Sequence, residues 1–81
     1  MDYKKIAEDV LENVGGKENI SSATHCITRL RLILKDKSKA NMEMLEEIEG
    51  AKGVLFNSGQ LQVIFGTGII EKVYKEFVEL T

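Results

Sequence analysis

The sequence predicts an α+β fold in which a four-stranded antiparallel sheet is covered by helices on one face. Apolar residues recur at helical spacing near both ends of the chain, and a two-residue alternation typical of strands lies between them. Short turns join the predicted strands into two hairpins. The 81 residues suffice for one hydrophobic core. We therefore expect a single domain over residues 1–81, with elements in the order α-β-β-α-β-β-α.

The first half of the chain predicts a helix and a hairpin. The helix starts after Asp2, ends at Gly15-Gly16, and carries an apolar face of Tyr3, Ile6, Ala7, Val10 and Val14. Residues 19–25 are β-tolerant and predict a strand. Residues 29–35 predict a clearer strand, because Leu30, Leu32 and Leu34 alternate with Arg29, Arg31 and Lys35. One face of this strand is expected to be buried and the other to be mostly cationic.

The second half repeats the pattern of a helix and a hairpin and adds a final helix. After a polar loop over residues 36–40, Asn41 is a predicted N-cap for a short helix that presents Met44, Leu45 and Ile48 to the core. Residues 54–56 and 61–65 flank the turn at residues 57–60 and predict the second hairpin. Thr67 is the predicted cap of the last helix, whose apolar stripe is Ile70, Val73, Tyr74, Phe77 and Val78.

Composition excludes several classes of protein. A formal net charge of -2 argues against nucleic-acid binding. No apolar run exceeds three residues, whereas a membrane span needs about 20. One histidine and one cysteine fall short of a metal site, and Gly16-Lys17 lacks the rest of a nucleotide-binding P-loop, so we expect no cofactor. A single cysteine forms no internal disulfide, which fits a reducing cytoplasm.

The densest group of chemically active residues surrounds the only thiol, Cys26, at the predicted turn between the first two strands. Arg29 and Arg31 follow it two residues apart, which on a strand places them on one face roughly 7 Å from each other. Nearby cations lower the pKa of a thiol and would also neutralise a phosphoryl group on its sulfur. Backbone amides of the turn and the hydroxyl of Thr28 would add donors. This pattern predicts a surface site at the tip or edge of the sheet.

Other interpretations of these residues remain open at this point. From spacing alone, a lone cysteine is more often a buried apolar filler, and strand arginines are usually solvated. The chain would then be a non-catalytic interaction or regulatory module, or a redox-sensing thiol protein. His25 is adjacent to Cys26, but neighbours on a strand point to opposite faces, which favours a structural or solvent-facing histidine. Neither alternative function explains two arginines directly beyond the cysteine.

Three segments together resemble a known family: residues 15–20, residues 24–31 with their Cys-x-Thr-Arg-Leu-Arg signature, and residues 60–66, preceded by Gly53-Val54. They resemble the IIB domain of the glucose superfamily of the bacterial phosphoenolpyruvate-dependent sugar phosphotransferase system. The resemblance runs from about Tyr3 to about Phe77. It implies the same four-stranded fold, and a phosphocysteine carrier that accepts a phosphoryl group from a phosphohistidine of a IIA domain and transfers it to a sugar bound by the membrane IIC domain.

The resemblance also implies roles for individual residues. Cys26 would be the phosphocysteine nucleophile, Arg29 and Arg31 would assist transfer to the sugar, and Thr28 and Ile27 would belong to the phosphate-binding loop. Residues 24–25 are Thr-His where glucose-specific members have Asp-Ala, so the chain looks more like the β-glucoside, sucrose or trehalose branches. The implied location is the cytoplasmic side of the cell membrane, as part of a permease whose polypeptide is expected to continue beyond this module. The sugar itself is not specified, because another domain binds it.

Overall fold

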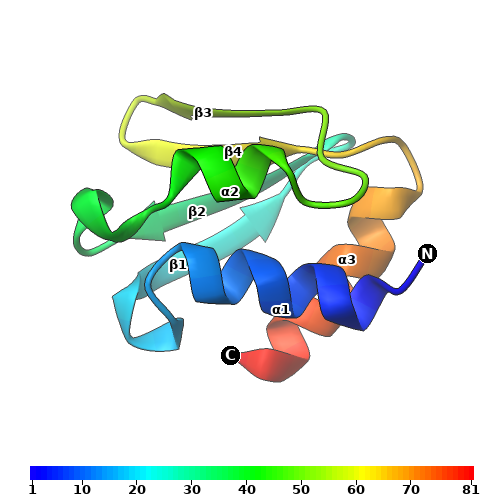
Figure 1. The fold of residues 1–81 in the computed structure, drawn as a ribbon, viewed down its shortest axis with the longest axis horizontal. Helices are drawn as coiled ribbons and strands as arrows, with labels where there is room; N and C mark the ends of the chain where they lie inside the picture. Colours follow the sequence, from blue (N-terminus) through cyan, green and yellow to red (C-terminus); the bar gives the residue numbers. More distant parts are fainter.

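A computed structural model describes all residues from 1 to 81. Its helices and strands follow one another as α1 (Tyr3–Asn13), β1 (Ile20–His25), β2 (Arg29–Leu34), α2 (Met42–Glu46), β3 (Gly53–Asn57), β4 (Gln60–Ile64) and α3 (Ile69–Leu80) (Figure 1). Single turns of 3-10 helix at Lys17–Asn19 and Lys37–Lys39 precede β1 and α2. The predicted α+β class and the predicted order of elements are confirmed.

The four strands form one antiparallel sheet in the order β1-β2-β4-β3. In the first hairpin β1 pairs with β2, and in the second β3 pairs with β4. The two hairpins join where β2 pairs with β4, with Leu30 opposite Val63 and Arg31 opposite Gln62. The polar strand β1 forms one edge of the sheet and β3 forms the other. Polar residues suit an edge strand, since they discourage further pairing with another chain.

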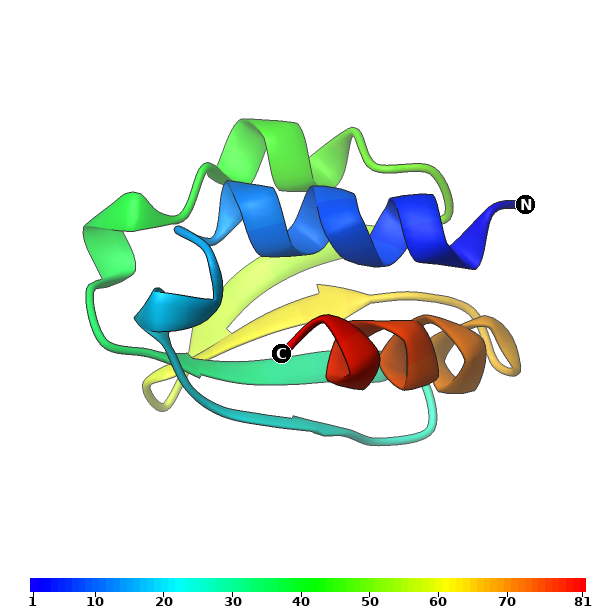
Figure 2. The same ribbon diagram turned by 90° about the horizontal axis from the view of Figure 1, so that it is seen from below.

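All three helices cover the same face of the sheet, and α1 lies between α2 and α3 (Figures 1 and 2). The core between these layers contains 15 buried apolar residues. From the sheet, it takes alternate residues of the two central strands, namely Leu30, Leu32, Leu61 and Val63. The intervening residues of the same strands lie on the helix-free face, as the two-residue period requires. None of the helices has the length and apolar character needed to span a bilayer.

Several predicted helix ends are confirmed. The Asp2 carboxylate accepts a hydrogen bond from the Lys5 backbone N–H at 3.1 Å, and the Asn41 side chain accepts one from the Met44 N–H at 3.2 Å. After α1, Gly15 has a φ of 98°, and a Cβ placed there would lie 2.9 Å from Lys39 Cβ. Two features therefore favour glycine at the end of α1, namely the positive φ and the close approach of the 3-10 turn at Lys37–Lys39.

The last helix begins later than predicted. Gly68, with a φ of 84°, is the N-cap, and α3 starts at Ile69, so Thr67 does not cap it. The backbone reverses at Gly68 in a conformation that threonine adopts poorly, which places the helix start beyond this glycine. The strand predicted from residue 19 likewise begins one residue later, because Asn19 belongs to the preceding 3-10 turn.

Two predicted core residues lie at the surface instead. Met44 is 47% exposed and Val78 is 48% exposed. The five-residue helix α2 reaches the core with Leu45, and Ile48 follows it there from the next turn, so Met44 falls on the outer side. Val78 lies beside the buried stripe of α3, where no other element covers it. Apolar spacing alone does not show how wide the covered face of a helix is.

Candidate functional site

Cys26 begins a tight loop, residues 26–28, that connects β1 to β2. The Cys26 N–H donates to the Arg29 carbonyl at 3.0 Å and closes the turn. The Phe65 N–H donates to the Thr28 carbonyl at 2.7 Å and ties the loop to the end of β4. Cys26 is half-buried and lies at one end of the sheet, outside the hydrophobic core. The loop therefore presents the thiol on a fixed backbone.

The loop and Arg31 together favour ionisation of the thiol. They lower the pKa of Cys26 to about 7, with the hydrogen bond from the Thr28 backbone N–H as the largest cause. Arg31 is next, since its Nη2 lies 3.7 Å from the sulfur, and the Arg29 backbone N–H adds a smaller contribution. Partial burial acts in the opposite direction. About half of the thiol is therefore ionised near pH 7.

The two arginines on β2 lie on the helix-free face but have different partners. Arg31 donates from Nη1 to Gln60 Oε1 at 3.0 Å and from Nη2 to the sulfur of Cys26. Arg29 donates from Nη1 to Gln62 Oε1 at 2.7 Å. The structure thus brings Arg31 to the thiol and holds the Arg29 guanidinium against the neighbouring strand. Neither arginine forms an ion pair with a carboxylate, because the single ion pair of the chain is Lys5–Asp9 on α1.

The other two predicted site residues contribute through the loop backbone. Thr28 is half-buried. Its backbone N–H donates to the Cys26 sulfur, and its carbonyl accepts from the Phe65 N–H. The Ile27 side chain is 76% exposed, the largest exposure among the big apolar side chains. Such a side chain beside the thiol is available for contact with another molecule. The backbone N–H of Ile27 is not among the groups that act on the sulfur.

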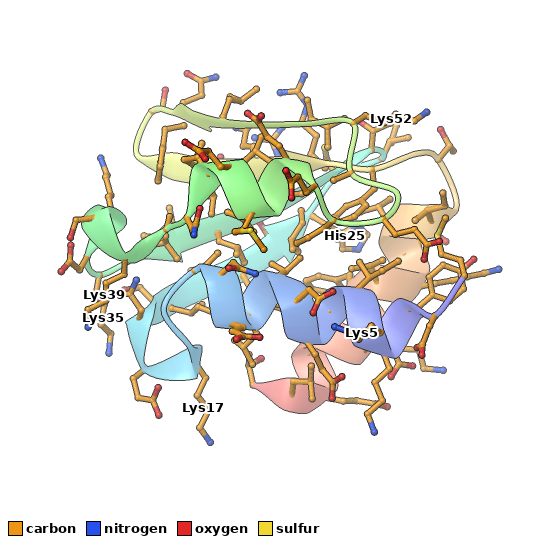
Figure 3. The ribbon with its side chains drawn as sticks, in the orientation of Figure 1. Lys5, Lys17, His25, Lys35, Lys39 and Lys52 are labelled. Atoms are coloured by element: carbon orange, nitrogen blue, oxygen red, sulfur yellow. The ribbon has the colours of Figure 1, made fainter.

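His25 lies on the helix-covered face of the sheet, opposite the face that carries the arginines. Its ring centroid lies 4.4 Å from that of Tyr74 on α3, and its Nδ1 lies 3.1 Å from the Cys26 carbonyl oxygen. The Tyr74 hydroxyl donates to the Ala23 carbonyl at 3.2 Å, which further joins α3 to β1. In Figure 3, His25 lies toward the end of the molecule opposite Lys17, Lys35 and Lys39. Its contacts are those of a structural histidine beside the loop.

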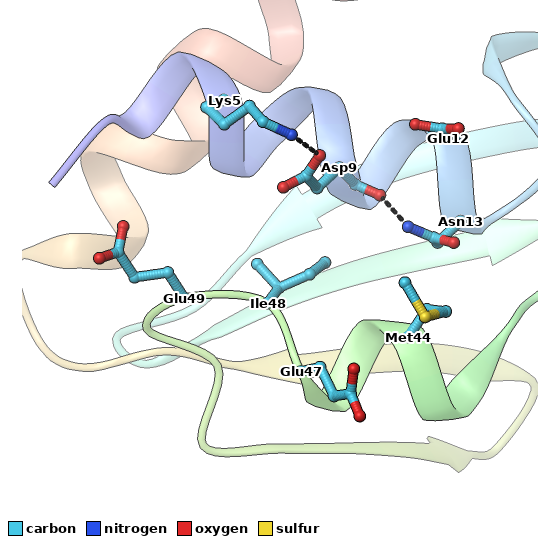
Figure 4. A pocket seen from close by; sticks show the side chains of 8 residues that line it. All are labelled: Lys5, Asp9, Glu12, Asn13, Met44, Glu47, Ile48 and Glu49. Atoms are coloured by element: carbon cyan, nitrogen blue, oxygen red, sulfur yellow. Dashed lines mark hydrogen bonds and ion pairs between the residues drawn. The ribbon is translucent and has the colours of Figure 1, made fainter.

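Neither cavity in the molecule includes the thiol or the arginines. One, of about 340 Å³, lies between α1 and the α2 region and is lined mainly by polar and acidic side chains, including Asp9, Glu12 and Glu47 (Figure 4). The other, of about 450 Å³, adjoins the start of β1 and the end of the chain at Thr81. The Cys26 site therefore lies outside both cavities, with its thiol half-buried at the end of the sheet.

Gln60 and Gln62 are the residues of this arrangement that the sequence analysis did not identify. Both lie on β4, on the same helix-free face as the arginines, and they are the only glutamines of the chain. Their spacing repeats that of the arginines, but the prediction placed Gln60 in the turn at residues 57–60 and only Gln62 on the strand, so the pair was not visible as one strand face. What joins the two pairs is the pairing of β2 with β4, which no local pattern specifies.

Comparisons with known proteins agree with this architecture. A family model described as "phosphotransferase system, EIIB" matches residues 8–41. The chain is 54% identical over 77 residues to the sucrose-specific EIIBC component of Bacillus subtilis (strain 168), covering 95% of this chain and 17% of that protein. It is 49% identical over 80 residues to the trehalose-specific EIIBC component of the same organism, covering 99% of this chain and again 17% of the relative.

A solved structure gives a match over most of both chains. The crystal structure of one domain of the PTS system IIabc component from Clostridium difficile superposes with a TM-score of 0.92 at 46% sequence identity. The superposition covers 96% of this chain and 81% of that one. In addition, the sucrose- and trehalose-specific relatives align with nearly the whole chain, including the loop at Cys26. The chain therefore belongs to the EIIB family of the phosphotransferase system.

Proposed function

We propose that residues 1–81 form a IIB phosphocarrier domain, in which Cys26 accepts a phosphoryl group from a phosphohistidine of a IIA domain and passes it to a sugar bound by a membrane IIC domain. The observation that carries this proposal is the thiol on its fixed loop, with Arg31 Nη2 3.7 Å from the sulfur and no carboxylate paired with Arg31; this setting lowers the pKa of Cys26 to about 7. Such a group is a nucleophile at neutral pH and stands beside a cation available to a second anion.

The first transfer uses the thiolate as nucleophile. Its sulfur attacks the phosphorus of the phosphohistidine, the S–P bond forms as the P–N bond breaks, and the departing imidazole keeps the electron pair and takes up a proton from solvent. Arg31, already 3.7 Å from the sulfur, faces the negative charge of the incoming group. The N–H groups of Thr28 and Arg29, which favour the thiolate in the free protein, are donors at the same position.

The second transfer reverses the role of the sulfur. A sugar hydroxyl oxygen attacks the phosphorus, the O–P bond forms as the S–P bond breaks, and the sulfur leaves with the electron pair as a thiolate. The proton of the hydroxyl passes to a base or to water at the acceptor. A thiolate of low pKa is a good leaving group, so the interactions that help it accept the phosphoryl group also help it release it. Arg29 and Arg31 would stabilise the charge of the transferring group.

The partners follow from the same proposal. The names of the relatives combine the B component with a C component, and a β-glucoside-specific relative from Halalkalibacterium halodurans adds an A component. We assign this domain to the cytoplasmic side of a permease, where the Cys26 site serves the donor and the acceptor in turn. Sucrose, trehalose and β-glucosides, which the names of the relatives specify, are the sugars to test first.

The test is intact mass spectrometry under non-acidic conditions, after incubation with phosphoenolpyruvate, the general phosphotransfer proteins of the system and a IIA domain. We expect one added phosphoryl group on the wild-type chain and none on Cys26→Ser. No addition with several IIA domains, in a chain that circular dichroism shows to be folded, would refute the carrier role. That outcome would favour an interaction module, for which the exposed Ile27 is the supporting observation.

A further inference from the structure

Two glutamines on β4 connect the arginines of the proposed site into one hydrogen-bonded chain. Arg29 donates to Gln62 Oε1 at 2.7 Å, and Gln62 Nε2 donates to Gln60 Oε1 at 3.3 Å. The same oxygen of Gln60 accepts from Arg31 at 3.0 Å, and Arg31 reaches the sulfur of Cys26 at 3.7 Å. The chain of contacts thus runs across β2 and β4 from one guanidinium to the other and ends at the thiol.

Burial fixes the orientation of the central amide. Gln62 is only 2% exposed although it lies on the face of the sheet that no helix covers, and no buried polar side-chain atom of the protein lacks a partner. A guanidinium only donates hydrogen bonds, so the atom of Gln62 that faces Arg29 is the oxygen, and the amide nitrogen is left to donate to Gln60. A fully paired buried amide of this kind has one favoured arrangement, which also orders its neighbours.

The β4 partners of both arginines are neutral amides. The common partner of an arginine is a carboxylate, which binds both arms of the guanidinium and cancels its charge. The chain has 13 acidic residues against 11 basic ones, so carboxylates are not scarce, yet none pairs with either arginine. Amide oxygens orient a guanidinium without neutralising it. No carboxylate neutralises either arginine, so the positive charge beside the Cys26 sulfur remains available to a group bound there.

We propose that Gln60 and Gln62 are positioning residues of the phosphoryl-transfer site: as neutral acceptors they hold the guanidiniums of Arg31 and Arg29 in place and leave their charge for the phosphoryl group. Gln60 acts on Cys26 through Arg31. Gln62 holds Arg29 and, through its amide nitrogen, steadies Gln60. The use of this charge on a phosphoryl group rests on the proposed function. The hydrogen bond from Arg31 to Gln60 also affects the pKa of the unmodified Cys26 thiol, because Arg31 contacts the sulfur, and this effect is measurable without a phosphoryl donor.

The deciding experiment measures the rate of Cys26 alkylation by iodoacetamide as a function of pH in the 81-residue chain. The main variant is Gln60→Glu, which keeps the shape and an oxygen acceptor but places a negative charge against Arg31. We expect the midpoint of its pH profile to rise above that of the wild type. A rise of one pH unit lowers the thiolate fraction at pH 7 from about a half to about a tenth, a loss of about fivefold.

The matched control is Asn57→Asp. Asn57 lies opposite Gln60 in the β3–β4 register and on the same face, so the variant adds the same charge without a hydrogen bond to either guanidinium. We expect its midpoint to stay closer to the wild-type value than that of Gln60→Glu. Two other titratable side chains near this end of the sheet are common to every variant: His25, which contacts Tyr74 and the Cys26 carbonyl, and Lys52, whose ammonium group lies close to Gly66.

Phosphoryl acceptance from a phosphorylated IIA domain gives the second readout. We expect both Gln60→Glu and Gln62→Glu to accept the group more slowly than the wild type, while circular dichroism shows Gln60→Glu to be folded. A folded Gln60→Glu that keeps the wild-type midpoint and rate overturns the positioning role and leaves the carrier function intact. A wild-type chain that accepts no phosphoryl group, alongside a shifted midpoint in Gln60→Glu, overturns the carrier function and supports the hold on Arg31.

Discussion

Replacing Arg31 by methionine separates the contribution of its guanidinium to the low pKa of Cys26 from that of the loop backbone. The backbone N–H of Thr28 is the larger cause and survives the substitution, whereas the hydrogen bond and charge of Arg31 are lost. We therefore expect the pKa of Arg31→Met to lie between the wild-type value of about 7 and the ordinary value of 9.0. A methionine of similar length preserves the packing of the stem, so the change reports on the guanidinium.

The magnitude follows from the fraction of thiolate and its nucleophilicity. At pH 7, a thiol with a pKa of 7 is about half ionised, and one with a pKa of 9 is about 1% ionised. Nucleophilicity rises with pKa, by about six- to tenfold over the same interval, which offsets part of that roughly fiftyfold difference. The complete loss of the shift would thus slow alkylation at pH 7 by about five- to eightfold, and Arg31→Met should slow it by less.

The assay is the rate of iodoacetamide alkylation across the pH range, with Arg29→Met as the control. The guanidinium of Arg29 bonds Gln62 and is not among the causes of the Cys26 shift, so the control should keep a midpoint near 7. An unchanged midpoint in Arg31→Met would show that the guanidinium does not act on the sulfur. A midpoint at 9.0 would show that the loop amides contribute nothing. Either result refutes the reasoning.

Three further predictions concern stability and are measured by urea unfolding. The pKa of Cys26 is lower in the folded chain than in the unfolded chain, so between pH 7 and 9 the unfolded chain binds more protons than the folded one. The free energy of unfolding should therefore rise with pH over this range, and the rise should vanish in Cys26→Ser. Asn19→Ala should cost about 3 kcal/mol, since the buried amide bonds Val14 O, Asp36 O and Asp36 N at 2.8 to 2.9 Å; a cost below about 1 kcal/mol would contradict this. Phe77→Ala should cost about 3–5 kcal/mol because Phe77 is fully buried, and a near-neutral result would show that the core collapses around the gap.

Local sequence patterns predicted the elements of this fold well, because their signals are short-range. Alternation of leucine and cationic residues over residues 29–35 predicted β2, and the turn at residues 57–60 predicted the second hairpin, where Ser58 and Gly59 have φ values of 53° and 81°. Cap residues acted locally too, since Asp2 and Asn41 both bond the N–H three residues ahead. The errors at Met44 and Val78 arose where exposure depends on which neighbour covers a helix.

The residues around the thiol divide in the same way. Cys26, Arg29 and Arg31 lie within six positions of sequence, so a strand period and a turn sufficed to group them, and the family resemblance then suggested their roles. Gln60 and Gln62 approach the arginines from 29 and 33 residues away. Local patterns assigned Gln60 to a turn and Gln62 to a strand, and a glutamine pair has no chemistry of its own until the opposite strand is known.

Spacing along the chain was sufficient to predict the class of the fold, the order of its elements and the grouping of a thiol and two cations at one turn, because each of these depends on residues close together in sequence. Tertiary structure alone decided the strand order β1-β2-β4-β3. The pairing of β2 with β4 places Arg31 opposite Gln62, and the Phe65 N–H anchors the loop that carries Cys26. This long-range pairing also gives the two arginines their glutamine partners. A strand's own residues do not specify its neighbour, so these contacts are not visible in the sequence.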